Sequence, residues 1–538
     1  MSELMQDSDK QNAILHPFLN TDVLIYIMRF LTQKGHLLQM MKTCRSLYYS
    51  GLPLLLFSIT DVAFLKDSNE APTRMISFSQ FIMADPKIRG PMVRDLKVLV
   101  SQYPERYFGV LRTFAKVLAE LKNLEYLQIF GLERWLKLEK GLMPTLAALP
   151  KIKTIRFKPG DNGVDTADRT VQTLKAMHSP VRVLHLELAY TARHQSLFKT
   201  LQNFSSTLEF LIVTIAILEK VDVIYPQLKA LDIKYLKPDM IRIAPLVACA
   251  PNLENLSLGD LVGFCLELDP LRAHNVQTQR THTWSRLDTL TGGIISLYLS
   301  GIQCPVRHLS AYDSLQNEST ISMWQTVVQD TLPSALTINL CKLEVEDLPT
   351  LIPERAKANL THLKLSLGVN VFNDSTGVDG IQNNLLALLR PLPLTFLDFG
   401  ISWYHDDPDF AECWGFGNED EDREQSDDKN EADREKSEPE DGSEDAYSYE
   451  LARKRDLGPM GSHISALLER LDDLVQHIAE AATTLRTVVF RVRVEREDDC
   501  FVFDVYSKDA KICVSRSQRY YATVSKEEGM SDLAWDEG

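Results

Sequence analysis

The chain has 538 residues, of which 44% are hydrophobic, and a formal net charge of −16. This length exceeds that of one compact domain, so the chain holds several domains or one long stacked core. The acidic balance argues against a general nucleic-acid-binding surface and against electrostatic attachment to a membrane. The N-terminus lacks the pattern of a signal peptide, and the longest apolar run, residues 210–218, is too short to span a bilayer. We therefore expect a soluble protein of the cytoplasm, the nucleus or both.

The first helical pattern lies in residues 15–56, after a polar segment (1–14) whose composition predicts disorder. A helix is expected to start after Asn20, and a second helix is expected to end at Gly51-Leu52-Pro53. The first helix is apolar almost all round, whereas an ordinary surface helix is apolar on one stripe. It is therefore either the N-terminal cap of the next domain or a helix with one face for a partner.

The order Leu19-x-x-Asp22-Val23-Leu24-x-x-Ile27-x-x-Phe30-Leu31, followed by Leu37-Leu38 and Met41-x-x-Cys44-Arg45, resembles the F-box. The F-box is the module by which substrate receptors of SCF-type ubiquitin ligases bind a Skp-type adaptor. Two positions depart from its usual pattern: Asn20 stands where Pro is common, and Leu47 stands where Trp is common. The resemblance, of the fungal type, covers about residues 15–56. It implies adaptor-binding residues Leu19, Val23, Leu24, Ile27, Phe30, Leu31, Leu38, Met41, Cys44 and Leu47.

From residue 121 onward a unit of the form apolar-x-x-apolar-x-apolar recurs, mostly at intervals of 25 to 29 residues. A longer gap, between the units at 253–258 and 306–311, leaves room for a degraded copy near residues 286–292. The units begin at Leu124, Ile152, Val181, Leu208, Leu228, Leu253, Val306, Ala335, Leu360, Leu394 and Leu485.

Each unit predicts a short strand with inward-pointing apolar residues and a return over the outside by a helix or turn. Such units bury their leucines only against their neighbours, so they stack. The expected fold class is α/β, with an N-terminal helical F-box and an irregular leucine-rich-repeat horseshoe solenoid. The alternative is a conventional α/β domain with parallel strands, in which the strands would be more continuously apolar.

In each predicted strand, the residue between the two inward-pointing positions faces the open surface of the solenoid. These residues are mixed in charge and type, which suits a protein target better than a uniform polyanion. The alternative is that they are ordinary solvated positions. The candidate target-binding residues are Gln128, Arg156, His185, Asp232, Asn339, Lys364 and Asp398.

The solenoid is expected over residues 57–417, with an acidic, disordered insertion at 418–447. Between residues 418 and 445 there are 15 acidic and 4 basic residues. The insertion would aid solubility, contact a basic partner or act as a spacer. The last repeats and a C-terminal cap are expected at 448–525, followed by a flexible tail at 526–538. An aromatic cluster, Trp403 to Phe416, is expected to pack under a loop rather than to bind a partner.

Enzyme motifs for phosphate, dinucleotide, zinc or serine chemistry are absent from the sequence, and the eight cysteines include no C-x-x-C pair. We therefore expect no catalytic activity, no cofactor and no metal. The sequence predicts a monomeric substrate receptor within a cullin-RING ligase, which holds a protein target on its repeats for ubiquitination and subsequent degradation. The alternative is a leucine-rich-repeat scaffold that binds proteins without any role in ubiquitination.

Overall fold

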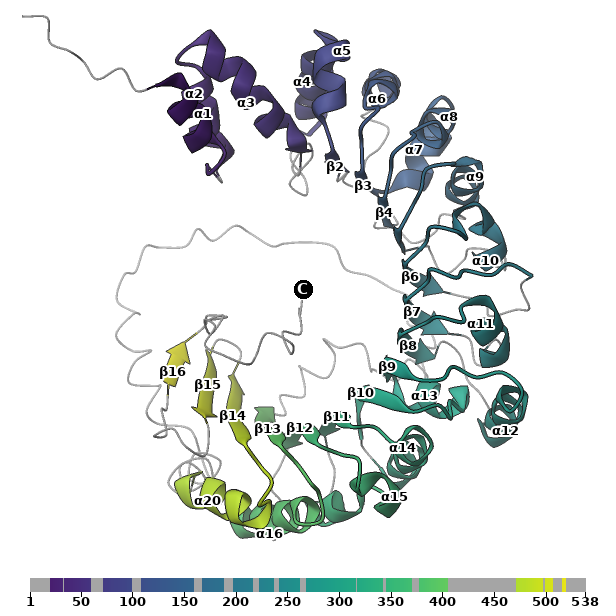
Figure 1. Ribbon diagram of the computed structural model, residues 1–538, viewed down its shortest axis with the longest axis vertical. Helices are drawn as coiled ribbons and strands as arrows, with labels where there is room; N and C mark the ends of the chain where they lie inside the picture. The colour runs from purple at the N-terminus through teal and green to yellow at the C-terminus, as the bar shows by residue number, and fades with distance from the viewer. Residues whose placement is uncertain are drawn as a thin grey trace, which may run out of the picture. The chain divides into compact units, whose positions relative to one another are not determined.

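Figure 1 shows the computed structural model of the chain. The contacts divide the chain into two units, residues 1–284 and 285–538. The structure describes residues 20–31, 33–59, 71–98, 108–158, 167–187, 197–215, 222–236, 241–261, 268–315, 317–341, 345–369, 377–404, 471–496, 499–506 and 515–518. The expected disordered segments 1–14, 418–447 and 526–538 lie outside the described residues, as does most of the aromatic cluster after Tyr404.

Unit 1 begins with three helices, α1 (Thr21–Met28), α2 (Lys34–Met41) and α3 (Arg45–Phe57). The Asn20 side chain accepts a hydrogen bond from the Asp22 amide at 2.9 Å, so Asn20 is the N-cap of α1, as expected. The expected helix end at Gly51-Leu52-Pro53 is wrong, because α3 continues through Pro53.

Packing explains why α3 continues past this sequence. A Cβ atom at Gly51 would overlap the side chains of Met28 and Met41, so α3 passes very close to α1 and α2 at this residue. Met28, Met41 and Leu52 are buried in the resulting contact. Apolar burial of this kind offsets the hydrogen bond that a proline removes from a helix.

The remainder of unit 1 is a series of β/α repeats in which each strand is parallel to the next. The strands are β1 (Ser58–Ile59), β2 (Asp95–Val98), β3 (Tyr126–Phe130), β4 (Thr154–Lys158), β5 (Val183–Leu186), β6 (Phe210–Ile215), β7 (Ala230–Leu236) and β8 (Asn255–Leu261). The helices are α4 (Ala71–Met83), α5 (Pro86–Arg89), η1 (Gly90–Met92), α6 (Phe108–Glu120), α7 (Leu132–Leu138), α8 (Leu142–Ala147), α9 (Asp168–Ala176), α10 (Leu197–Thr200), η3 (Gln202–Phe204), α11 (Ile243–Cys249) and α12 (Leu268–Gln279). Within this unit the helices lie on one side of the strands (Figure 1).

The strand register confirms the repeat pattern in unit 1. Leu127 pairs with Ile155, and the same row continues through Leu184, Leu211, Leu231 and Leu256, all of them buried. The row also extends further back than expected, to Leu96 of β2, which in turn pairs with Ile59 of β1. The segment Val93-x-x-Leu96-x-Val98 has the same spacing, so the sequence contained this signal although the repeats were expected only from residue 121.

Unit 2 holds a second array, in which strands β9 to β14 are mutually parallel and β15 and β16 are added antiparallel. The strands are β9 (Leu287–Gly292), β10 (Val306–Leu315), β11 (Ala335–Cys341), β12 (His362–Val369), β13 (Phe396–Tyr404), β14 (Thr487–Arg496), β15 (Asp499–Tyr506) and β16 (Ser515–Gln518). The helices are α13 (Ile294–Ser300), α14 (Glu318–Thr331), η5 (Val345–Thr350), α15 (Glu354–Lys357), α16 (Gly377–Leu389) and α20 (Leu471–Ala481). Strand β9 is the expected degraded copy, and the array resumes with α20 and β14 as expected.

One repeat in unit 2 has a different frame from the expected one. The sequence pattern put Ala335, Ile338 and Leu340 in the three apolar positions of this repeat. In the structure Leu336 pairs with Leu363, and Ile338 pairs with Leu365. The apolar positions of this repeat therefore lie two residues earlier than expected, on the same face of the strand. Because side chains alternate between the two faces of a strand, a shift of two residues leaves the same side chains buried.

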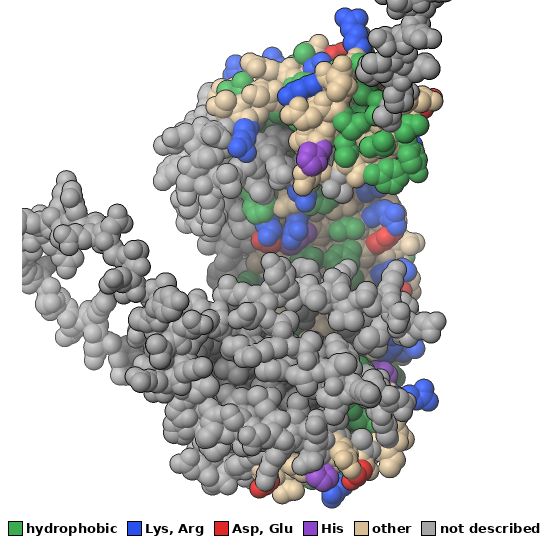
Figure 2. Space-filling view, turned by 90° about the vertical axis from the view of Figure 1, so that its left-hand side faces the viewer, with side chains coloured by type: hydrophobic (Ala, Val, Ile, Leu, Met, Phe, Trp, Pro, Cys, Tyr) green, Lys and Arg blue, Asp and Glu red, His purple; other side chains and the backbone are tan. Residues whose placement is uncertain are grey.

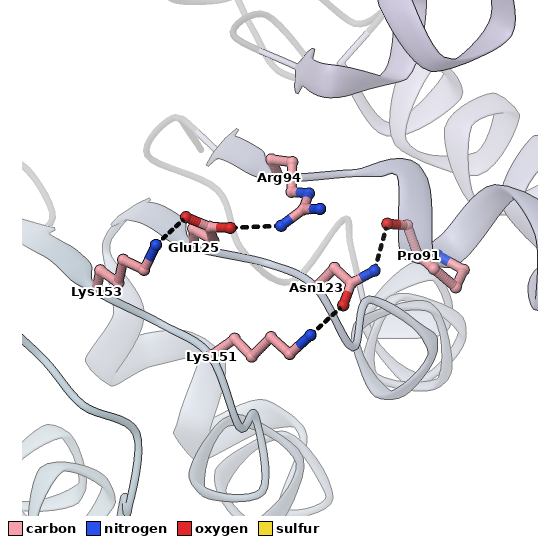
Figure 3. A network of polar contacts seen from close by, with 6 residues as sticks. All are labelled: Pro91, Arg94, Asn123, Glu125, Lys151 and Lys153. Carbon is pink, nitrogen blue, oxygen red and sulfur yellow. Dashed lines mark hydrogen bonds and ion pairs between the residues drawn. The ribbon is translucent and has the colours of Figure 1, made fainter.

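Polar side chains at the starts of the strands connect successive repeats. In unit 1 the Glu125 carboxylate binds Arg94 of the preceding repeat, and its Oε2 lies 2.6 Å from Nζ of Lys153 in the next (Figure 3). Beside them, Asn123 donates to the Pro91 carbonyl at 2.9 Å and accepts from Lys151 at 2.8 Å (Figure 3). These contacts join three repeats at one edge of the sheet.

In unit 2 the equivalent position carries an ion pair between Asp288 and Arg307 on β9 and β10, followed by hydroxyl groups at the starts of β11 to β13. The Ser334 hydroxyl donates to the Arg307 carbonyl at 3.0 Å, the Thr361 hydroxyl to the Ser334 carbonyl at 3.1 Å, and the Thr395 hydroxyl to the Thr361 carbonyl at 3.1 Å. In both units this strand-start position carries contacts between neighbouring repeats, which are ion pairs at several repeats of unit 1 and neutral hydrogen bonds at the starts of β11 to β13 of unit 2.

Candidate protein-binding surfaces

The three N-terminal helices expose a group of large apolar side chains, which we call the helical apolar surface. In Figure 2 hydrophobic side chains (green) gather over these helices. Exposed apolar groups of this size on a water-facing surface usually mark an interface. The surface consists of Val23 (47% exposed), Tyr26 (59%), Ile27 (40%), Phe30 (65%), Leu38 (40%) and Tyr49 (64%).

Helix geometry explains why four of these residues form one stripe. Three of them follow Val23 by three, four and seven residues, namely Tyr26, Ile27 and Phe30. This spacing places all four along one side of α1 and the turn after it. The rings of Tyr26 and Phe30 meet edge to face, with their centroids 4.9 Å apart. Met28, on another side of the helix, is buried against α2 and α3. The helix thus has one apolar side packed and another exposed.

The structure places the ten residues implied by the F-box resemblance in three different environments. Val23, Ile27, Phe30, Leu38 and Cys44 are exposed, while Leu24 and Leu31 are half-buried. Met41 and Leu47 are each only 3% exposed, so they belong to the core of the helices and do not reach the surface. Leu19 lies outside the described residues. Tyr26 and Tyr49 were missed, although the spacing of Tyr26 on α1 could have found it.

The second candidate surface is the face of the unit 1 strands opposite the buried leucines. The register places Gln128 beside Arg156, Arg156 beside His185, and Asp232 two strands further along, beyond Ile212. Lys97 of β2 pairs with Gln128 and begins this row. We call it the strand-face row. Sequence reasoning missed Lys97, although its position between Leu96 and Val98 fits the same pattern.

Members of this row differ in exposure. Gln128 (7% exposed) and His185 (9%) are almost buried, whereas Arg156 and Asp232 are half-buried. The Tyr126 hydroxyl donates a 2.7 Å hydrogen bond to Oε1 of Gln128. Burial raises the pKa of Tyr126, so this hydroxyl remains a neutral donor at physiological pH.

Electrostatics in the row centre on the neighbouring Arg156 and His185. Burial, and then the positive charge of Arg156, hold the pKa of His185 below its usual range, so its ring is neutral at physiological pH. Nε2 of His185 lies 2.8 Å from Oε1 of Glu187, but the alignment is too poor for a strict hydrogen bond. The same carboxylate is 3.0 Å from Nζ of Lys158 and neutralises that lysine.

In unit 2 the register aligns Ser310, Thr337, Lys364 and Asp398 in one row. Asn339 lies two residues beyond Thr337 and pairs with Ser366, so it is not in this row. The shifted repeat frame is the reason, and Thr337 takes the expected position. Asp398 is 6% exposed, which leaves little of its side chain accessible to a partner.

The part of the chain that the structure describes contains no group of three His, Cys, Asp or Glu side chains placed to hold a metal ion. The same residues include no helix suited to crossing a membrane. Burial raises the pKa of Cys249 to about 12 and that of Cys304 to about 11, so both thiols are protonated at physiological pH.

Comparison with known proteins shows only weak similarity to a solved structure. The chain matches no protein-family model, and no curated protein matches it. Among solved structures it is similar to the leucine-rich repeat-containing protein LegL7 from Legionella pneumophila, at 15% identity and a TM-score of 0.29. That match covers 57% of this chain and 83% of the other. The leucine-rich-repeat-like architecture described above therefore rests on the strand register of the two units and not on this match.

Proposed function

We propose that this protein is an F-box substrate receptor, which binds a Skp-type adaptor through α1 to α3 and a protein target through the strand faces of its repeats. The observation that carries the proposal is the helical apolar surface. Its exposed stripe on α1 falls on residues that the F-box resemblance assigns to the adaptor, among them Val23, Ile27 and Phe30. Burying such a surface against a partner would contribute roughly 25 cal/mol for each Å² of apolar area.

The arrangement of the three helices agrees with the same proposal. In the F-box a third helix carries a Cys-Arg-containing run, and α3 begins at Arg45, directly after Cys44. Helix α3 contacts α5, η1 and β1, whereas α1 contacts α3. The first repeat of unit 1 therefore covers part of α3 and leaves the stripe on α1 exposed. A helical unit that only capped the repeats would bury its apolar residues against them.

In this role the protein would perform no bond chemistry. The adaptor would connect the chain to a cullin-RING ligase in the cytoplasm or nucleus, and the repeats would hold the target near the ubiquitin-conjugating enzyme. The contribution to rate would be proximity, because holding two reactants together raises their effective concentration. Ubiquitination of the target would then lead to its degradation.

Co-purification of the full chain with a Skp-type adaptor tests the proposal. Ile27→Asp places a charge in the centre of the stripe, and we expect it to abolish co-purification while leaving the protein folded. Ile295→Asp is the matched control, because Ile295 of α13 is similarly exposed (37%, against 40% for Ile27) but lies in unit 2. Wild-type protein that fails to bind the adaptor, or Ile27→Asp protein that binds it normally, would leave a protein-binding repeat scaffold without a ubiquitin role.

A further inference from the structure

We propose that the strand face of β2 to β4 binds an acidic peptide segment of a protein partner, with two carboxylates held by Lys97 and Arg156. This inference deepens the proposed function, since it names the class of target that the repeats would take. It rests on the proposed function only where it assumes that the bound target is ubiquitinated. Binding of the peptide itself does not require the adaptor.

The first observation is that two cations on this face have no carboxylate partner among the described residues. The side chain of Arg156 interacts with the Tyr126 hydroxyl and influences His185. Its Nε is buried and has no hydrogen-bond acceptor. Lys97 interacts with the ring of Tyr126, 5.7 Å from its centroid. By contrast, two neighbouring basic residues are paired, Lys158 with Glu187 and Arg182 with Glu209.

The second observation is that the surroundings hold Arg156 in place. It lies between two nearly buried neighbours in the register, Gln128 and His185, which restrict its side chain. A fixed guanidinium group presents parallel N–H donors that match a carboxylate, and a half-buried site strengthens that interaction relative to water.

The third observation concerns spacing. Lys97 on β2 and Arg156 on β4 are both in register with Gln128 on β3, so they are two strands apart. Adjacent strands are about 4.8 Å apart, which puts the two backbones about 10 Å from each other. In a polyproline II conformation, side chains three residues apart point the same way and are separated by about 9 Å. An extended peptide with acids at positions i and i+3 therefore fits both cations.

The acidic groups on the face leave this site net positive. Glu187 is paired with Lys158 and lies beside His185, on the side of Arg156 away from Lys97. Asp95, two residues before Lys97, contributes to the electrostatic environment of Tyr126. Further along the face, Asp232 is paired with Lys234 at 2.8 Å, so this pair adds no net charge.

The test is binding of a fluorescein-labelled, end-blocked peptide, Gly-Ser-Asp-Ala-Pro-Asp-Ser-Gly, to the full chain. We expect saturable binding that weakens about tenfold or more in Arg156→Gln, because a hydrogen bond to a charged group is lost, and less in Lys97→Gln. Arg242→Gln changes an exposed arginine at the start of α11 and is the matched control, with wild-type affinity expected. The same peptide with Asn in place of Asp is expected not to bind.

Several results would overturn the proposal: unchanged affinity in Arg156→Gln, equal binding of the Asn peptide, or binding only of a phosphoserine version. Tighter peptide binding after deletion of residues 418–445 would also overturn the proposal. That result would mean that the chain's own acidic segment occupies the site. Adaptor co-purification of the same variants separates the two proposals. If it fails while the peptide binds, the F-box role is wrong and the peptide site stands.

Discussion

Glu133 of α7 caps α9 by binding Thr170 of the following repeat. One carboxylate oxygen accepts hydrogen bonds from the Thr170 amide at 2.8 Å and from its hydroxyl at 3.0 Å, and the other accepts from the Arg169 amide at 3.2 Å. The first amides of a helix lack partners within the helix, and the N-cap residue of α9, Ala167, has no side-chain oxygen to offer. A carboxylate there also faces the positive end of the helix dipole.

Glu133→Ala should therefore destabilise unit 1 by about 1–2 kcal/mol, because it leaves buried amides of α9 without acceptors. Urea-induced unfolding measures the loss, and faster hydrogen exchange at the Thr170 amide would locate it. Glu254→Ala is the control, since its ion pair with Lys229 is exposed and should be worth less than about 1 kcal/mol. Equal effects of the two substitutions would contradict this assignment.

The close approach of α3 to α1 and α2 predicts different effects for two glycine substitutions. Gly51→Ala should destabilise the N-terminal helices by about 1–3 kcal/mol, because the new methyl group displaces the Met28 and Met41 side chains. Gly35→Ala adds the same methyl group in α2, where it meets no atom within 4 Å. This control should be neutral or slightly stabilising. Hydrogen exchange of α1 to α3 distinguishes the variants, and similar protection in both would refute the packing account.

His308 predicts a pH dependence for unit 2. Burial, and then the charges of Arg307 and Lys364, lower the pKa of His308 to about 4. The unfolded chain therefore takes up a proton near pH 6.5, before the folded protein does. The contribution of this group to stability is complete above pH 6.5 and is lost as the pH falls towards 4, with an upper limit of about 3 kcal/mol.

The measurement is urea-induced unfolding between pH 7.5 and 4.5 for the wild type and for His308→Gln. Gln keeps a polar group near the Thr337 hydroxyl, which lies 2.9 Å from Nε2 of His308. The wild type should lose stability faster than the variant as the pH falls. A difference between the two proteins that stays constant over this range would contradict the expected titration.

The ion pairs of unit 1 and the hydroxyl contacts of unit 2 should respond differently to salt. Glu125→Lys places three positive charges at successive strand starts and should cost about 1 kcal/mol at low ionic strength. Screening should reduce this loss in 0.5 M NaCl. Thr361→Val removes a neutral hydrogen bond at the equivalent position, with a similar loss that salt should not change. Equal salt dependence in both would contradict the distinction.

The ion pairs of Glu125 also predict how the stability of unit 1 changes in acid. Hydrogen bonding to Lys153 is the leading cause that holds the pKa of Glu125 below its usual value of 4.5. Its contribution is therefore present above pH 4.5 and is lost as the pH falls through the lower folded-state pKa. Glu125→Gln should remove this component and flatten the loss of unit 1 stability below pH 4.5, as measured by urea-induced unfolding in acid.

The repeat strands could be predicted because their signal is local. Spacing such as Leu127-x-Ile129 marks the buried side of a strand within a few residues, and the intervals between units show that such strands recur. The expected assignment of apolar positions in the repeat at Ala335 was wrong, because the pattern does not distinguish between alternate residues on one face of a strand. Only the pairing with β12 decides between them. The strand-face row needed the same register to align residues from different repeats.

Contacts between distant residues account for what sequence reasoning missed. The cap that Glu133 provides joins residues 37 positions apart, and neither residue belongs to a recognised capping pattern. The end of the second helix was misplaced because Pro53 was read by its local preference. Packing of α1 and α2 against Gly51 carries α3 through that position.

By itself the sequence determined that this protein is built from stacked β/α repeats with an apolar helical segment at its N-terminus. Periodicity encodes that information, because burial must recur with the geometry of strands and helices. Only the tertiary structure decided that Met41 and Leu47 are core while Tyr26 and Phe30 are exposed, and that Arg156 lacks a carboxylate among the described residues. Exposure and pairing depend on which neighbours reach a side chain, and those neighbours come from other helices and other repeats.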